Sequence, residues 1–180
     1  MKRFSAFKIV ISALFAALVC VATMLVQIPI TATGGYANLG DGVVLVCAFL
    51  LHPFYAVLAA GIGSLLADLL AGFAVYAPAT LVIKACVALI ASLIYNRFGR
   101  GKGRGRMIAA MIISAVLAEA LMVLGYFFYE AVILGMGWAA AAGIVGNVMQ
   151  GVAGIIAASI ITPVLSASKE VSELMDKTRR

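Results

Sequence analysis

Long runs without a charged residue limit the possible folds of this chain more than any other sequence feature. The first run, Ile9–Ile28, is about as long as one helix needs to cross the hydrocarbon core of a bilayer. It exceeds the apolar core of a secretory signal peptide, and no small-residue cleavage site follows it. The 180 residues are 65% hydrophobic and 11% charged, far from the composition of soluble domains. We therefore expect an all-α integral membrane protein with a single transmembrane domain over residues 1–180.

Basic residues indicate which helix ends face the cytoplasm. They gather before the first run, where Lys2 and Arg3 stand, in the loop 97–106, and in the tail 169–180. Short segments rich in Lys and Arg stay on the cytoplasmic side of a membrane. Both termini and the loop 97–106 are therefore predicted to be cytoplasmic, which requires an even number of crossings between the first residue and that loop.

The tract Gly42–Ala71 decides the number of crossings. It is long for one helix, and His52-Pro53 lies inside it, where a proline disfavours a continuous helix. Only a split at His52-Pro53 gives an even number of membrane crossings. The second helix is then short, and short helices of this kind often mark the binding site of a transporter. The six expected helices are Ile9–Ile28, Gly42–Leu51, Phe54–Ala71, Ala79–Tyr95, Met107–Leu134 and Ala139–Leu165, with an outer loop at Thr31–Gly40.

Other functional classes find little support in the residues. The basic loop Gly99–Arg106 has the Arg-Gly pattern of some RNA-binding segments, but fits a cytoplasmic loop that sets orientation, so no nucleic-acid partner is expected. It also lacks the spacing of a phosphate-binding loop. Cys20, Cys47 and Cys86 stand apart in apolar runs without a neighbouring His. No catalytic residue, metal site or cofactor is assigned.

Polar side chains inside the apolar runs are predicted to meet at one depth. Counted at about 1.5 Å per helical residue, Asp68, Lys84, Glu130 and Asn147 lie one to two turns below the outer surface. A buried charge is costly unless it faces a partner or a cavity, so these residues indicate a pocket for a small polar, aromatic ligand. Tyrosines near the same level offer stacking faces: Tyr36, Tyr76, Tyr126 and Tyr129.

Two points stay open at this level. Asp68 and Lys84 are either an ion pair that neutralises two buried charges, or part of the ligand site. Glu119 lies near mid-membrane with no basic residue at its depth, so it is protonated, hydrogen-bonded to another helix, or turned toward a second subunit.

The segment GGYANLGD and the run ADLLAGFAVYAPATLVIK, Ala67–Lys84, resemble the S components of energy-coupling factor (ECF) vitamin transporters, in particular the riboflavin-type group. The resemblance implies a substrate-binding subunit of the prokaryotic plasma membrane that works with a transmembrane coupling subunit and two cytoplasmic ATPase subunits. It implies that Ala13 and Ala17 of an AxxxA pattern meet the coupling subunit. It also implies a lid in the outer loop, which holds Tyr36, Asn38 and Asp41.

The predicted function follows from the pocket and the resemblance together. The ligand is a vitamin or precursor such as riboflavin, pyridoxine or hydroxymethylpyrimidine, and nothing in the sequence selects among them. The predicted ligand-binding residues are Asn38, Tyr76, Lys84, Tyr126, Glu130, Asn147 and Gln150. The alternative is a self-sufficient transporter or channel that acts as an oligomer without ATPases. A membrane enzyme has little support, because the single His52 lies far from Asp68 and Glu130.

Overall fold

The computed structural model describes residues 6–179, so Lys2, Arg3 and Arg180 of the predicted orientation pattern lie outside the described residues. The elements are α1 (Ala6–Leu25), β1 (Gln27–Ile30), β2 (Gly35–Asn38), α2 (Gly40–Leu50), α3 (Pro53–Leu70), α4 (Ala77–Phe98), α5 (Arg104–Phe128), the π-helical turn η1 (Tyr129–Ile133), the 3₁₀ turn η2 (Gly137–Ala140), α6 (Ala141–Ala167) and α7 (Lys169–Arg179). Within the described chain, five helical stretches are long and apolar enough to cross a membrane, and α2 is a shorter apolar helix.

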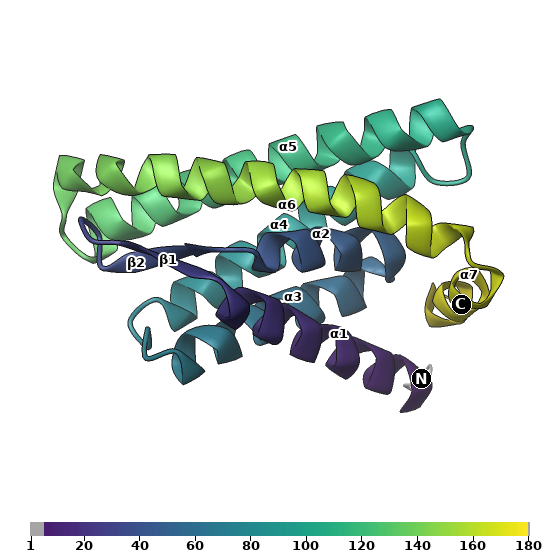
Figure 1. The fold of residues 1–180 in the computed structure, drawn as a ribbon, viewed down its shortest axis with the longest axis horizontal. Coiled ribbons are helices and arrows are strands. Elements are labelled where there is room, and N and C mark those ends of the chain that lie inside the picture. Colours follow the sequence, from purple (N-terminus) through teal and green to yellow (C-terminus); the bar gives the residue numbers. More distant parts are fainter. Residues whose placement is uncertain (1–5, 180) are drawn as a thin grey trace.

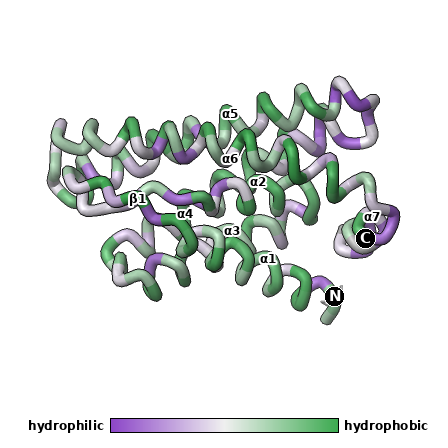
Figure 2. Tube along the Cα trace, viewed as in Figure 1, coloured by the Kyte–Doolittle hydropathy of each residue, from purple (hydrophilic) through white to green (hydrophobic). Residues whose placement is uncertain are grey.

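The helices form an elongated bundle with two distinct ends (Figure 1). The β1–β2 hairpin, the α3–α4 connection and the α5–α6 connection lie at one end. The start of α1, the α4–α5 loop and α7 lie at the other. In Figure 2, hydrophobic residues run along the helices, and hydrophilic residues gather in the α4–α5 loop and α7. Large apolar side chains remain exposed on the outer faces of all five long helices, as expected for surfaces that contact lipid.

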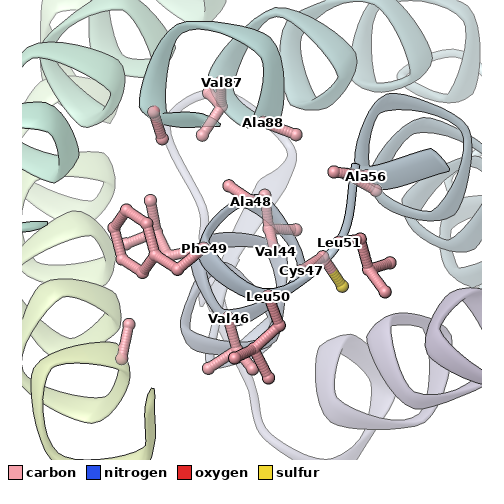
Figure 3. Packing of buried hydrophobic residues seen from close by; sticks show 14 of the residues in the cluster. Val44, Val46, Cys47, Ala48, Phe49, Leu50, Leu51, Ala56, Val87 and Ala88 are labelled. Atoms are coloured by element: carbon pink, nitrogen blue, oxygen red, sulfur yellow. The ribbon is translucent and has the colours of Figure 1, made fainter. Parts of the chain in front are cut away.

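The short helix α2 is the centre of the bundle. Its residues from Gly40 to Leu50 are buried except Val43, and Figure 3 shows them surrounded by the neighbouring helices. A helix that is apolar all round has no face for water and packs inside the protein. Glycines bring α2 and α6 close together: a Cβ on Gly42 would lie 3.0 Å from Ala157 Cβ, and one on Gly154 would lie 2.9 Å from Asp41 Cβ.

The break between α2 and α3 falls at His52-Pro53. Leu51 and His52 have extended backbone, and the His52 Nδ1 accepts a hydrogen bond of 3.2 Å from the Phe54 amide, which caps α3. Pro53 occupies the first turn of α3, where its missing N–H costs nothing. The tract Gly42–Ala71 therefore forms two helices, as the charge pattern predicts.

The outer segment after α1 differs from its prediction. The sequence suggests a helix to Ile28 followed by an irregular loop, but α1 ends at Leu25 and the chain forms an antiparallel hairpin in which Pro29 pairs with Tyr36. Gly34, with a φ of 72°, makes the turn between the strands. The strand-favouring branched residues around Pro29 therefore extend the chain instead of prolonging the helix.

The tail is also more ordered than predicted. Residues 169–179 form α7, which buries Met175 and Thr178 against the bundle. Five of its charged side chains are exposed: Lys169, Glu170, Glu173, Asp176 and Lys177. Asp176 of α7 lies 3.9 Å from Arg100 of the α4–α5 loop. The prediction counted only the charges of the tail and overlooked the apolar positions spaced for one helical face.

Candidate ligand-binding site

One polar pocket lies between the hairpin and the helices α1, α3, α4, α5 and α6. All seven predicted ligand-binding residues line it, and Tyr36 and Asp68 line it as well. The free cavity among these side chains is about 30 Å³, far below the roughly 300–1,000 Å³ of a typical ligand pocket. The remaining lining residues are Thr23, Ile30, Gly35, Ser64 and Thr80.

Beneath the pocket, Asp41 joins three elements. Lys84 of α4 forms a buried ion pair with Asp41 Oδ1, and the Gln150 side-chain amide of α6 donates to Asp41 Oδ2 at 2.6 Å. Gln150 Oε1 in turn accepts a hydrogen bond of 2.7 Å from the backbone amide of Asn38 in β2. Two buried charges are thus tolerated because each is paired and hydrogen-bonded.

These contacts correct two expectations. Lys84 pairs with Asp41 and not with Asp68, so the first of the two open alternatives, an Asp68–Lys84 ion pair, is excluded. Asp41 belongs to the first turn of α2 and is 0% exposed, so it does not lie in the outer lid. Depth counting places residues at a level, but it does not give the direction in which a side chain points around a helix axis. The N-terminal position in α2 also suits a carboxylate, because the helix dipole is positive there.

Asp68 of α3 is tied to the hairpin. The Tyr36 hydroxyl donates a hydrogen bond of 2.6 Å to Asp68 Oδ1, and the Tyr36 ring packs on Phe73 with centroids 4.5 Å apart. Burial and the neighbouring Asp68 carboxylate raise the pKa of Tyr36 above its ordinary value, so the hydroxyl keeps its proton and remains the donor. The second oxygen, Asp68 Oδ2, has no hydrogen-bond partner within the described chain.

Tyr76, at the start of α4, links the hairpin turn to Glu130. Its hydroxyl lies 2.7 Å from the carbonyl oxygen of Thr33, to which it donates, and 3.2 Å from Glu130 Oε1. Burial and Glu130 raise the pKa of Tyr76 to about 12. Glu130 lies in the π-helical turn η1, and Gly143 of α6 leaves room for its carboxylate: a Cβ there would lie 2.9 Å from Glu130 Oε2. Such π turns are frequent at functional sites.

Tyr126 lies one helical turn before Glu130 and closes the α4 side of the pocket. Its hydroxyl and Thr80 Oγ1 are 2.9 Å apart. The ammonium of Lys84 lies 5.5 Å from the centre of the Tyr126 ring, within the range of a cation–π interaction. The pocket therefore combines carboxylates, amides, hydroxyls and aromatic rings from segments far apart in the chain.

Comparison with known proteins identifies the family. The model for the S component of ECF-type riboflavin transporters matches residues 3–167. This chain belongs to that family. An uncharacterized protein in the gap 3′ region of Pyrococcus woesei is 39% identical over 138 residues, which cover 77% of this S component and 87% of the relative. The structure of the S component of a bacterial ECF transporter is similar in fold, with a TM-score of 0.67 and 19% identity over 88% of this chain and 95% of that one.

Membership establishes the general role. An S component is the substrate-binding membrane subunit of an ECF transporter, and its family is a family of transporter components, not of enzymes. The protein crosses the membrane several times, in agreement with its long apolar helices. Within the described chain, no group of three His, Cys, Asp or Glu side chains is arranged to hold a metal ion.

Two residues that the sequence of this S component singles out, Tyr129 and Glu119, lie outside the pocket lining. The Tyr129 hydroxyl donates to the carbonyl oxygen of Val75, and its ring lies 5.8 Å from that of Tyr76. Glu119 is 4% exposed, faces α6 next to Gly151, and has no hydrogen-bond partner for either carboxyl oxygen within the described chain. Glu119 therefore faces the interior and not a second subunit.

Some lining residues of the S component escaped the sequence reasoning. Ser64 and Thr80 line the pocket, each four residues before a predicted polar residue of the same helix, Asp68 and Lys84 respectively. That spacing puts the two side chains of each pair on one helical face. Ser64 and Thr80 could have been identified from it. Thr23 offered no comparable signal, because a threonine in an apolar helix is common.

Ala13 and Ala17 of the S component are exposed on α1, away from the ligand pocket. They line a groove between α1 and α3 with a cavity volume of about 490 Å³. The groove is almost entirely apolar, and its α3 side includes Phe54, Leu58 and Ile62. An apolar surface of this size on a membrane protein faces either lipid or another membrane subunit.

Proposed function

We propose that this S component captures a vitamin or vitamin precursor from the outer side of a prokaryotic plasma membrane. It then works with a transmembrane coupling subunit and two cytoplasmic ATPase subunits that power uptake. The observation that carries the proposal is the convergence of seven predicted residues, from the hairpin and three long helices, on one pocket. The ligand class comprises small heteroaromatic molecules, among them riboflavin, pyridoxine and hydroxymethylpyrimidine.

The proposed orientation puts both termini and the α4–α5 loop in the cytoplasm, with α2 and α3 as separate segments of a six-helix arrangement. Two observations support it. The start of α1, the basic loop and α7 share one end of the bundle, and the hairpin lies at the other (Figure 1). Tyr36 and Asn38 of this hairpin line the pocket. The positive-inside rule assigns the end rich in Arg and Lys to the cytoplasm.

The hairpin acts as the lid in this proposal. It contributes Tyr36 and Asn38 to the pocket, and it is joined to the helices by the Tyr36–Asp68, Asn38–Gln150 and Thr33–Tyr76 hydrogen bonds. A cavity of about 30 Å³ holds about one or two water molecules. A heteroaromatic ligand therefore requires the hairpin to move away from the helices before it enters.

The groove beside Ala13 and Ala17 is the proposed docking surface for the coupling subunit. Small residues four positions apart allow another helix to approach closely in lipid. The groove lies on α1 and α3 and shares no residue with the ligand pocket. Binding of the ligand and docking are therefore separable by mutation.

The test is to replace Ala13 and Ala17 together by Phe. Two bulky rings fill the groove, so we expect vitamin uptake to fall at least tenfold in cells that contain the coupling and ATPase subunits. Ligand affinity of the purified protein is expected to stay within about twofold, because the pocket is untouched. The measurements are uptake of radiolabelled vitamin and equilibrium binding of the vitamin that copurifies with the protein.

The matched control places the same bulk on another exposed face. Val116 and Ala120 of α5 are exposed and also stand four residues apart. Their replacement by Phe is expected to leave uptake unchanged. Unimpaired uptake by the Ala13/Ala17 variant, or uptake in cells without ATPase subunits, would contradict the proposal and favour the self-sufficient transporter.

A further inference from the structure

We infer that the ligand of this pocket is a small cationic heteroaromatic molecule whose ammonium and N–H groups bind the carboxylates of Asp68 and Glu130. The inference rests on the proposed function and narrows its ligand class. It follows from the charges in the pocket, from the hydrogen bonds that these charges already make, and from the character of the lining.

Each of the two carboxylates has one oxygen that can accept a hydrogen bond from a ligand. Asp68 and Glu130 are 4% and 3% exposed, and both side chains line the pocket. One oxygen of each lies within hydrogen-bond distance of a tyrosine hydroxyl, as described above. The other oxygens, Asp68 Oδ2 and Glu130 Oε2, are buried and have no hydrogen-bond partner in the described part of the chain. Buried acceptors left in this way are costly, so a ligand that supplies donors gains affinity there.

The one basic residue of the lining is already engaged. Lys84 is 3% exposed, and its ammonium is paired with Asp41, which also accepts from Gln150. An anionic ligand would have to compete with this buried pair. Lys84 and Asp41 together carry no net charge. Asp68 and Glu130 are acidic residues of the lining that form no ion pair within the described chain. Burial makes their ionised forms costly, and a cationic ligand offsets that cost.

Aromatic rings add to the attraction for a cation. Tyr36, Tyr76 and Tyr126 line the pocket around the carboxylates. The faces of such rings attract ammonium and other cationic groups within about 6 Å, and they stack on heteroaromatic rings. A ligand with a planar ring and a positive charge uses both features.

The lining has few aliphatic side chains. Of its fourteen residues, only Ile30 and Gly35 lack a polar group in the side chain. A tricyclic flavin has a methylated benzene edge, which gains most from an apolar wall. The pocket therefore suits a single-ring nitrogen heterocycle with polar substituents better than a flavin.

The experiment uses matched pairs of probes on the purified full chain in lipid nanodiscs. Pyridoxamine differs from pyridoxine, and 4-amino-5-aminomethyl-2-methylpyrimidine differs from its 5-hydroxymethyl analogue, by an ammonium in place of a hydroxyl. Calorimetry at pH 7.5 compares each pair, with riboflavin as the neutral tricyclic probe. We expect the cationic member of at least one pair to bind at least tenfold more tightly than its neutral match and than riboflavin.

Two isosteric variants assign the preference to the pocket. Asp68→Asn and Glu130→Gln keep the side-chain shape and remove the negative charge, so each is expected to reduce the preference for the cationic probe at least fivefold. Glu173→Gln removes the same charge from an exposed position of α7 and is expected to preserve the preference. Retention of the full preference in both pocket variants would overturn the inference.

Different experimental results would contradict this inference and the proposed function. Equal binding within both pairs, or tighter binding of riboflavin, overturns the cationic class and leaves vitamin capture intact. Binding of none of the five probes at 1 mM also overturns the inference. If, in addition, the protein copurifies with no small molecule and supports no uptake, the proposed function fails with it.

Discussion

Lys84 shows how a single charge is accommodated inside a membrane protein. Its ammonium is buried with the carboxylate of Asp41, and the second oxygen of that carboxylate accepts from Gln150. In a low-dielectric interior, an ion pair contributes little net stability, but loss of one partner leaves an uncompensated charge. Removal of either Lys84 or Asp41 alone is therefore expected to destabilise the protein more than removal of both charges together.

A double-mutant comparison tests this dependence. Lys84→Met leaves Asp41 buried and unpaired, which costs about 3–5 kcal/mol. For a chain of 180 residues this corresponds to a Tm lower by roughly 6–20 °C. Lys84→Met combined with Asp41→Asn is expected to regain most of the loss, measured by thermal unfolding in detergent micelles. The single variant Asp41→Asn completes the comparison. If the double variant loses as much stability as Lys84→Met and Asp41→Asn lose in sum, the two charges do not interact.

The sequence anticipated these residues but not their partners. Polar side chains in apolar helices have to turn inward in lipid, so the seven predicted residues and Asp68 converge on one pocket. Pairing was beyond reach because it depends on rotation about each helix axis and on the start of α2. Asp41 looked like a loop residue beside Gly40, and only the helix start at Gly40 turns it toward Lys84.

At the level of elements, α1 and α3 pack so closely that a side chain is excluded. A Cβ on Gly63 of α3 would lie 2.4 Å from the Ala16 carbonyl oxygen and 2.8 Å from Val19 Cβ. Real Cβ atoms do not approach a backbone oxygen so closely, so a larger residue pushes the helices apart. Close packing at small residues is a main source of helix association in membranes.

Gly63→Ala is expected to destabilise the protein by about 1–3 kcal/mol, because it overpacks this contact. Gly105→Ala, near the start of α5, is the matched control, since a Cβ there meets nothing within 4 Å. The control is expected to be neutral or slightly stabilising because alanine favours helix. Thermal unfolding of both variants measures the difference, and equal melting temperatures would argue against steric exclusion at Gly63.

Helix positions were predictable, whereas the hairpin and α7 were not. Long apolar runs and the charge parity locate the main helices to within a few residues of their observed bounds. The hairpin escaped because strand pairing between residues 27–30 and 35–38 depends on contacts across a turn and leaves no long apolar signal. The charged residues of α7 concealed the apolar face that carries Met175.

At the scale of the whole molecule, Tyr76 connects the hairpin, α4 and the end of α5. Its hydroxyl donates to Thr33 and lies within hydrogen-bond distance of Glu130. Tyr76→Phe removes these contacts at a cost of about 1 kcal/mol, so amide hydrogens of residues 27–38 are expected to exchange roughly fivefold faster. Hydrogen exchange read by mass spectrometry measures the effect in the ligand-free protein.

Tyr129→Phe is the control for this change. It removes a hydroxyl that donates to Val75, outside the hairpin. Exchange in the hairpin is expected to remain that of the unmodified protein. Equal acceleration in both variants would mean that the tyrosine hydroxyls act on global stability and not on hairpin opening.

The central position of α2 also affects how readily ions and protons could leak through the protein. Below Asp41, the apolar side chains of α2 pack against α4 and its other neighbours, with Val44, Cys47 and Ala48 each 0% exposed (Figure 3). Ions and protons need a file of water or polar groups to pass through a protein. The packed helix interrupts such a file, so we expect an idle copy of the protein to leave the ion gradients across the membrane intact.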